Sequence, residues 1–389
     1  MSKIKDSLIV KLLAGVFVGI ILGLMLGRGP IQIILTVKEV LGQFIFFCVP
    51  LVIIGFIAPA ITNLKSNASK MLLVTLLIAY LSSVGAAALS TTGGYAIIPH
   101  LNIQNAAQGL RKLPEVLFKL DIPPVMSVMS ALVLSIVLGL TAVWTKSEHV
   151  DALLKEFNNM ILQVVEKMIV PILPIFIATT FAGLAYEGSI TRQLPVFLKV
   201  IVIVIVGQFI WMAVLYGIAG LISKKNPAEV FKHYVPAYLT AVGTMSSAAT
   251  MPVALKCARK SAVLDDEIVD FTIPICSTIH LCGSVLTETF FCMTISQILY
   301  GQLPTLGTML LFIALLGIFA VGAPGVPGGT VMASLGIVTS VLGFDTSGVA
   351  LLISIFALQD SFGTACNITG DGAIALMLMG IFKREKVSG

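Results

Sequence analysis

Residues 360–371 read Asp-Ser-Phe-Gly-Thr-Ala-Cys-Asn-Ile-Thr-Gly-Asp and lie inside an otherwise apolar segment. At about 100° per residue on a helix, the polar side chains of this stretch fall within a stripe about 60° wide. The members of the stripe are Asp360, Thr364, Asn367 and Asp371. Two carboxylates, an amide and a hydroxyl on one face of an apolar helix predict a binding site. A purely structural network of hydrogen bonds between helices is the alternative.

The composition of the whole chain identifies the solvent around that helix. Hydrophobic residues make up 57% of its 389 residues, charged residues make up 11%, and the mean hydropathy is +1.03. Soluble domains carry about 25% charged residues. A carboxylate at the centre of a bilayer costs about 3 kcal/mol, so it faces the protein interior or water and marks a functional site. We therefore predict an all-α polytopic membrane protein, because long apolar runs such as 200–206 lack the alternation of barrel strands.

A membrane-spanning helix needs about 20 apolar residues. Eight segments meet that need: 8–27, 37–62, 71–98, 124–145, 157–186, 195–223, 264–300 and 347–382. Two further apolar segments, 227–256 and 304–345, are interrupted by small residues, Gly and Pro and are predicted to be re-entrant hairpins. The first segment also has the composition of a signal peptide, but it is long and further spans follow it.

The basic residues between the spans predict the orientation of the chain. With the N-terminus inside, Lys3 and Lys5, the group 224–232 and the group 383–386 are cytoplasmic. Both termini are then in the cytoplasm. The net charge of +5 is explained by this topology and carries no signal for nucleic acid. The six cysteines form no C-x-x-C pair, so neither a disulfide framework nor a zinc site is predicted.

Both predicted hairpins have tips made of small residues. The tips are residues 244–252 and 322–330. Backbone groups exposed at membrane depth are tolerated only where they line a cavity or bind a ligand. The half-helices that follow each tip would present positive dipole ends, which favour a carboxylate. The paired tips, together with the similar stretches 47–52 and 171–176, indicate inverted repeats.

A second polar interruption occupies residues 276–288. Gly283 is predicted to mark an unwound point between two half-helices. His280 has two interpretations, a satisfied interior histidine or a titrating group. Glu288 lies in an apolar run, where a carboxyl group is a functional hypothesis.

These motifs together resemble the dicarboxylate/amino acid:cation symporter family, which has the glutamate-transporter fold. The resemblance rests on Ser246-Ser247, on Gly-Val-Pro-Gly-Gly at 325–329, and on the polar stripe of 360–371. It implies eight transmembrane helices plus two re-entrant hairpins, a homotrimer in a lipid bilayer and an elevator-type mechanism. The implied division is 1–70 (fixed scaffold, helices 1–2), 71–120 (moving helix 3 and loop), 121–190 (scaffold, helices 4–5) and 191–389 (moving transport domain).

The resemblance also implies roles for single residues. Asp360 would bind a substrate amino group, Asn367 its carboxylate, and Asp371 a coupling cation. The implied substrate-binding set is Ser246, Ser247, Ser284, Val326, Gly328, Asp360, Gly363, Thr364 and Asn367. The implied set for the coupling ion or proton is Tyr80, Ser83, His280, Cys282, Glu288, Asn367 and Asp371.

Two departures from the family pattern concern the substrate. Gly363 stands where members that carry acidic substrates have an arginine, and Met245 stands where an arginine is sometimes found in the first tip. Without a cation to pair with a second carboxylate, a neutral amino acid is favoured over an acidic one. Gly363 is also expected to leave room for a larger side chain of the substrate.

A third departure concerns coupling. The family sequence Asn-Met-Asp-Gly-Thr is replaced by residues 280–284, His-Leu-Cys-Gly-Ser. Hard cations prefer oxygen ligands, so an imidazole and a thiol weaken the usual sodium sites. Glu288 stands where proton-coupled members place a proton-carrying glutamate. Burial favours the neutral form of a carboxyl group, which suits a residue that takes up and releases protons.

We therefore expect a secondary active transporter in a bacterial-type cytoplasmic (inner) membrane, with proton coupling or exchange and no organic cofactor. Its partner is a small solute, most simply an amino acid. A sodium-coupled symporter, with residual sodium at Asn367 and Asp371, remains the alternative. An ion channel or an intramembrane aspartyl protease is more remote, since Asp360 and Asp371 lie about 16 Å apart on one helix.

Overall fold

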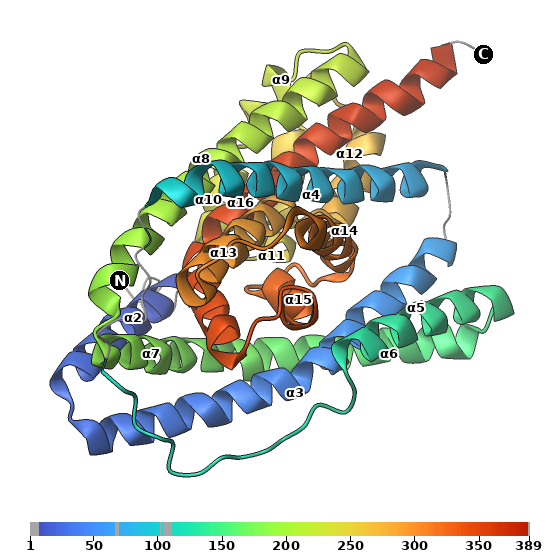
Figure 1. The fold of residues 1–389 in the computed structure, drawn as a ribbon. Coiled ribbons are helices and arrows are strands. Elements are labelled where there is room, and N and C mark those ends of the chain that lie inside the picture. The colour runs from blue at the N-terminus through green and yellow to red at the C-terminus, as the bar shows by residue number, and fades with distance from the viewer. Residues whose placement is uncertain (1–7, 67–69, 102, 104–110, 388–389) are drawn as a thin grey trace.

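A computed structural model describes residues 8–101, 103 and 111–387, except 67–69. All of its regular elements within these residues are helical (Figure 1). The first half contains α2 (Leu8–Met25), α3 (Arg28–Ser66), α4 (Lys70–Ile97), a 3₁₀ turn (Ile98–Leu101), α5 (Val128–Thr145), α6 (Glu148–Val164), a π-helical turn (Val165–Ile169), α7 (Val170–Glu187) and α8 (Ile190–Ser223). The second half contains α9 (Ala228–Phe231), α10 (Val235–Thr244), α11 (Ser247–Ala258), α12 (Asp266–Ile279), α13 (Cys282–Tyr300), α14 (Leu306–Gly322), α15 (Gly329–Ser340) and α16 (Thr346–Val387).

Seven helical segments of the described chain are long and apolar enough to cross a membrane. They match seven of the eight segments expected from the sequence. The remaining one, expected at 124–145, is α5, whose apolar part Ser130–Thr145 is shorter. The chain is therefore an all-helical protein with several membrane-crossing helices, and the count of eight spans stays a prediction.

Two sets of helices pack among themselves. The first set consists of α2, α3, α5, α6 and α7. The second set consists of α4, α8 and α10–α16, and its other helices pack around α13 and α16 (Figure 1). Contacts from α14 and α15 to α3, and from α15 to α5, join the two sets. Whether one set moves past the other is not determined by this packing, so the predicted division into scaffold and transport domain stays a prediction.

A ridge of glycines holds α2 against α7. Gly15, Gly19 and Gly23 recur every four residues on α2. A Cβ atom added to Gly15 would lie 2.6 Å from the carbonyl oxygen of Pro174, and one on Gly19 would meet the backbone of Ala178. Small residues allow such close approach of helix backbones within membranes, where packing rather than the hydrophobic effect drives association.

Both predicted hairpins are helix-turn-helix units. Met245 and Ser246 separate α10 from α11, and residues 323–328 separate α14 from α15. Met245 (φ 54°) and Gly328 (φ 73°) turn the chain through left-handed conformations. Glycine adopts this conformation without a steric cost, whereas Met245 does so as the residue that ends α10.

The predicted interruption of the 264–300 segment exists, but its position was wrong. The break between α12 and α13 lies at His280 and Leu281, and Gly283 is already inside α13. Gly283 is needed for close packing: its Cβ atom would lie 2.5 Å from the Cβ of Cys366. The predicted orientation depends partly on Lys3 and Lys5, which lie outside the described residues.

Candidate functional site

Asp360 lies at the second hairpin tip. Its Oδ2 accepts a hydrogen bond of 2.7 Å from the backbone N–H of Gly328, which directly precedes α15. The side chain is 4% exposed. The amide of a residue that precedes a helix has no partner within the helix, and Asp360 supplies the acceptor. The first polar residue of the stripe is therefore attached to the tip rather than to another helix face.

The two hairpin tips touch each other. The hydroxyl of Ser246 donates to the carbonyl of Gly325 at 2.8 Å, and the amide of Ala248 reaches the same oxygen at 3.3 Å. Ser246 also caps α11, accepting from Ala249 N at 3.2 Å. Ser247 is buried beside this contact, since a Cβ on Gly325 would lie 3.6 Å from its Cβ. The contact joins the first hairpin to the tip that also bonds Asp360.

Asn367 connects α16 to the first turn of α13. Its Oδ1 accepts from the amides of Gly283 (2.7 Å) and Ser284 (3.2 Å), and its Nδ2 donates to Ser284 Oγ at 2.9 Å. The first amides of a helix have no partner within the helix and need an acceptor. Asn367 supplies it, so both its amide oxygen and its amide nitrogen have protein partners in this structure.

Gly363 faces α13, and this changes its interpretation. A Cβ atom at position 363 would lie 3.3 Å from both Cα and Oγ of Ser284. The glycine allows the two helices to approach, which is a packing role. The space beside Gly363 is occupied by Ser284. The expectation that Gly363 leaves room for a larger substrate side chain is therefore not supported. Thr364, next in sequence, is buried at 4% exposure.

Asp371 forms a buried chain of contacts with His280. His280 Nδ1 lies 2.9 Å from Asp371 Oδ1, and His280 Nε2 lies 2.9 Å from the hydroxyl of Ser82. His280 and Asp371 are 0% exposed. Asp371 Oδ2 is buried and has no hydrogen-bond partner among the described residues. The break between α12 and α13 places the imidazole against the carboxylate.

The other predicted coupling residues lie around this chain of contacts. Cys282 is buried, and a Cβ on Gly370 would lie 3.5 Å from its sulfur. Tyr80 donates to the carbonyl of Ala314 at 3.3 Å. Ser83 is buried with an unpartnered hydroxyl. Ser82, the neighbour of Ser83 on α4, makes the contact with His280 and was not predicted.

Glu288 forms a second buried connection, between α13 and the second hairpin. Its Oε1 accepts from the hydroxyl of Ser334 on α15, and its Oε2 has no hydrogen-bond partner. Glu288 is 0% exposed and lies close enough to interact electrostatically with Asp360. Ser334 was missed by the sequence analysis, because no spacing within one helix connects it to Glu288.

Gln208 on α8 was also missed. Its Nε2 donates to Thr287 Oγ1 at 2.9 Å and lies 3.4 Å from the carbonyl of Gly283. A glutamine in the long apolar segment 195–223 was the available signal. Its contacts connect α8 to the first two turns of α13.

The composition of the site determines which ligands it can hold. Among the described residues, no group of three or more His, Cys, Asp and Glu side chains is placed to bind a metal ion. The available groups are single carboxylates, hydroxyls, the amides of Asn367 and Gln208, the imidazole of His280, the thiol of Cys282 and backbone amides at helix ends. Such groups suit a small polar solute, a proton or a monovalent cation.

A broken helix and two hairpin tips converging on buried carboxylates, within a set of membrane-length apolar helices, define a class of protein. Secondary transporters bind substrates and coupling ions at discontinuous helices of this kind. The comparison with known families agrees: residues 8–381 match the family described as the sodium:dicarboxylate symporter family. The chain belongs to this family.

The similar proteins are amino acid transporters. Excitatory amino acid transporter 2 of Mus musculus is 29% identical over 241 residues, which is 60% of this chain and 41% of the relative. Excitatory amino acid transporter 1 of Ambystoma tigrinum is 26% identical over 299 residues, 74% of this chain and 53% of the relative. The alignments thus span about half the length of these relatives. The chain thus shares its family with proteins that are named as amino acid transporters.

Proposed function

We propose that the chain is an elevator-type secondary active transporter for a small neutral amino acid, with proton coupling or exchange and weakened sodium sites. The names of the relatives support an amino acid as the class of substrate. The proposal includes a homotrimer in a bacterial-type cytoplasmic membrane, with both termini in the cytoplasm. The packing of helices into two sets is compatible with a scaffold and a moving part.

The substrate proposal depends on Asp360. A buried carboxylate beside a hairpin tip is a suitable partner for an ammonium group, and the bond from Gly328 N shows that it accepts donors from that side. No arginine stands at Gly363 or Met245, so a second carboxylate on the substrate has no guanidinium partner at those positions. A neutral amino acid therefore fits better than a dicarboxylate.

The single observation that carries the coupling proposal is the contact between His280 and Asp371. The imidazole lies at 2.9 Å from Asp371 Oδ1, where a cation would otherwise bind the carboxylate. An imidazole nitrogen is a poor ligand for a hard cation such as sodium. It can, however, take up and release a proton. Proton exchange at this pair thus replaces sodium binding in the proposed cycle.

Glu288 supports the same conclusion from a second place. Its bond to Ser334 joins the core helix α13 to α15 of the second hairpin. A carboxyl group buried without a cationic partner is stabilised in its neutral form. A proton carried by Glu288 would thus be linked to the position of the hairpin.

One observation favours sodium as the second candidate. Asp371 Oδ2 and the hydroxyl of Ser83 are both buried and without partners. Sodium binds oxygen ligands, and unpartnered buried oxygens are the type of group it would use. A sodium-coupled carrier therefore remains the competing function.

Uptake of labelled amino acids into proteoliposomes tests the coupling. With sodium replaced by a large organic cation, and with an inside-alkaline pH gradient, we expect uptake to continue. Complete loss of uptake without sodium would refute proton coupling and favour the second candidate. His280→Asn should increase sodium dependence, because an amide oxygen would replace an imidazole nitrogen beside Asp371.

The amino group is tested separately with Asp360→Asn. We expect this variant to lose uptake of all amino acids at otherwise normal expression and folding. Retained transport would show that the substrate lacks an ammonium group, or that Asp360 does not bind it. A competition screen of neutral against acidic amino acids then tests the preference for neutral substrates.

A further inference from the structure

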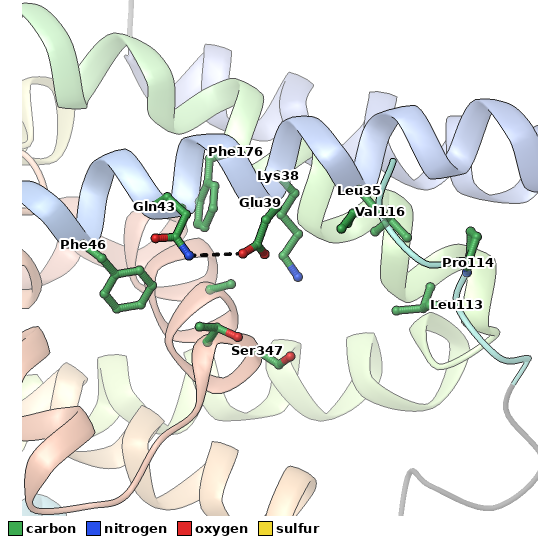
Figure 2. A pocket seen from close by; sticks show the side chains of 13 residues that line it. Leu35, Lys38, Glu39, Gln43, Phe46, Leu113, Pro114, Val116, Phe176 and Ser347 are labelled. Atoms are coloured by element: carbon green, nitrogen blue, oxygen red, sulfur yellow. Dashed lines mark hydrogen bonds between the residues drawn. The ribbon is translucent and has the colours of Figure 1, made fainter. Parts of the chain in front are cut away.

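A pocket lies away from the site at the hairpin tips, where the first turn of α16 meets α3 and α7. It is a solvent-open hollow with a cavity volume of about 180 Å³. Its walls come from α3 (Leu35–Phe46), from Phe176 on α7, from the stretch 113–116 and from the first residues of α16. Figure 2 shows Lys38 and Glu39 directed into the same space, with Ser347 of α16 across from them.

Two opposite charges line the pocket, Lys38 and Glu39, and Glu187 and Asp345, which do not line it, also act electrostatically on Lys38. No hydrogen bond or ion pair joins Lys38 to another residue of the described chain, although its side chain is partly buried. Glu39 accepts a hydrogen bond of 3.2 Å from Gln43 Nε2 (Figure 2). The Lys38 ammonium needs an acceptor, and the carboxylates attract a cationic group.

The rest of the wall is apolar and held in place. Phe46 and Phe176 lie on one side of the charged pair, and Leu113 and Val116 lie on the other (Figure 2). Two hydrogen bonds fix the segment that carries Leu113 and Val116. Its amide at Leu117 donates to Thr36 Oγ1 at 2.9 Å, and that at Arg111 donates to the Glu187 carbonyl at 3.0 Å. Arg111 also lies 4.9 Å above the ring of Tyr186.

We propose that this pocket is a second binding site, for a zwitterionic amino acid with an apolar or aromatic side chain. The ligand ammonium pairs with Glu39, its carboxylate pairs with Lys38, and its side chain lies between Phe46 and Phe176. A ligand with both charges satisfies Lys38 without adding net charge to an acidic surrounding. The hydroxyls at the start of α16 supply further hydrogen bonds to the carboxylate.

The position of the pocket gives the site a regulatory role. α3 and α7 belong to one packing set and α16 belongs to the other, so a bound ligand contacts both. This part of the proposal rests on the elevator movement proposed above. An amino acid in the pocket holds the two sets in their present relation and slows the cycle.

Binding is measured on the purified full-length Asp360→Asn variant, in which the site at the hairpin tips is disabled. The probes are L-phenylalanine, phenethylamine, which lacks the carboxylate, and 3-phenylpropionate, which lacks the amine. We expect one L-phenylalanine per chain and binding at least about tenfold weaker for each of the other two, since each loses a charge-assisted hydrogen bond. Absence of L-phenylalanine binding, or equal binding of phenethylamine, overturns the proposal.

Variants assign the binding to this pocket. Lys38→Gln and Glu39→Gln should each weaken L-phenylalanine binding at least about tenfold, whereas Lys112→Gln, at an exposed lysine nearby, should not. Gly42→Leu fills the pocket and leaves both charges in place; a Cβ there meets only the Phe176 ring, at 3.6 Å. Loss of binding in Gly42→Leu supports the location, and unchanged binding in both Lys38→Gln and Gly42→Leu refutes it.

The regulatory part has its own readout. In proteoliposomes of the parent protein, L-phenylalanine should slow exchange of a labelled substrate beyond simple competition, and Lys38→Gln should relieve this inhibition. Binding without inhibition keeps the site and refutes the elevator-dependent role. Failure of amino acid uptake altogether would refute the proposed function while the binding measurements on Asp360→Asn still decide the site.

Discussion

The bonds of Asn367 allow a prediction that separates folding from transport. Asn367→Ala removes the acceptor for two buried amides, those of Gly283 (2.7 Å) and Ser284 (3.2 Å). Each buried N–H without a partner costs about 1–3 kcal/mol, so we expect a loss of about 2–5 kcal/mol in the free energy of unfolding. This corresponds to a decrease on the order of 5 °C or more in the thermal midpoint.

The matched control is Asn367→Asp. In the parent, Asn367 Nδ2 donates to Ser284 Oγ at 2.9 Å. In its protonated form the aspartic acid carries an O–H that can donate to the same oxygen. Its C=O can accept from the two amides. We expect its stability to stay close to that of the parent, while uptake is lost if the amide binds the substrate carboxylate.

The assay is thermal unfolding in detergent, followed by intrinsic fluorescence, together with uptake into proteoliposomes. A midpoint for Asn367→Ala within about 1 °C of the parent would show that the two amides do not depend on this side chain. Normal uptake by Asn367→Asp would show that the residue has a structural role alone.

Two further predictions concern helix contacts and proton coupling. Gly15→Ala should destabilise the protein by about 1–3 kcal/mol, because its Cβ would lie 2.6 Å from the Pro174 carbonyl oxygen. The control Gly217→Ala has open space around the added Cβ and should not destabilise it. Equal midpoints of the two variants in thermal unfolding would contradict this prediction. Glu288→Gln keeps an acceptor for Ser334 but carries no proton, so uptake driven by a pH gradient should disappear while substrate exchange persists. Unchanged gradient-driven uptake would exclude Glu288 as the proton carrier.

Periodicity within a single helix was sufficient to predict much of the site. The polar stripe of residues 360–371 lies in one continuous helix, α16, and its members are buried. The two hairpins and the interrupted helix were also predicted, since small residues, Gly and Pro disrupt helices in recognisable patterns.

Contacts between helices were harder to predict. The sequence suggested Ser83, but Ser82 reaches His280, and the two positions differ by about 100° around α4. Choosing between them requires the rotation of α4 relative to α13, which no pattern within α4 contains. The partner of Glu288 was missed for the same reason, because Ser334 comes from a hairpin whose register on α13 is set by tertiary packing.

Gly283 shows how one residue type carries two signals. A glycine within an apolar helix predicts either a break or a close approach to another backbone. At this position the second applies, and the break occurs at His280 and Leu281. The Cys366 side chain beside Gly283 decides between them, and this proximity cannot be read from the sequence.

The bond between Gly328 N and Asp360 links ligand binding to the second hairpin tip. The backbone amide donates to the carboxylate that we assign to the ammonium of the amino acid, so an ammonium group that binds there competes with this hydrogen bond. Gly325, in the same tip, accepts from Ser246 of the first hairpin. We therefore expect an amino acid at Asp360 to change how firmly the second tip is held, and with it the contact between the two hairpins.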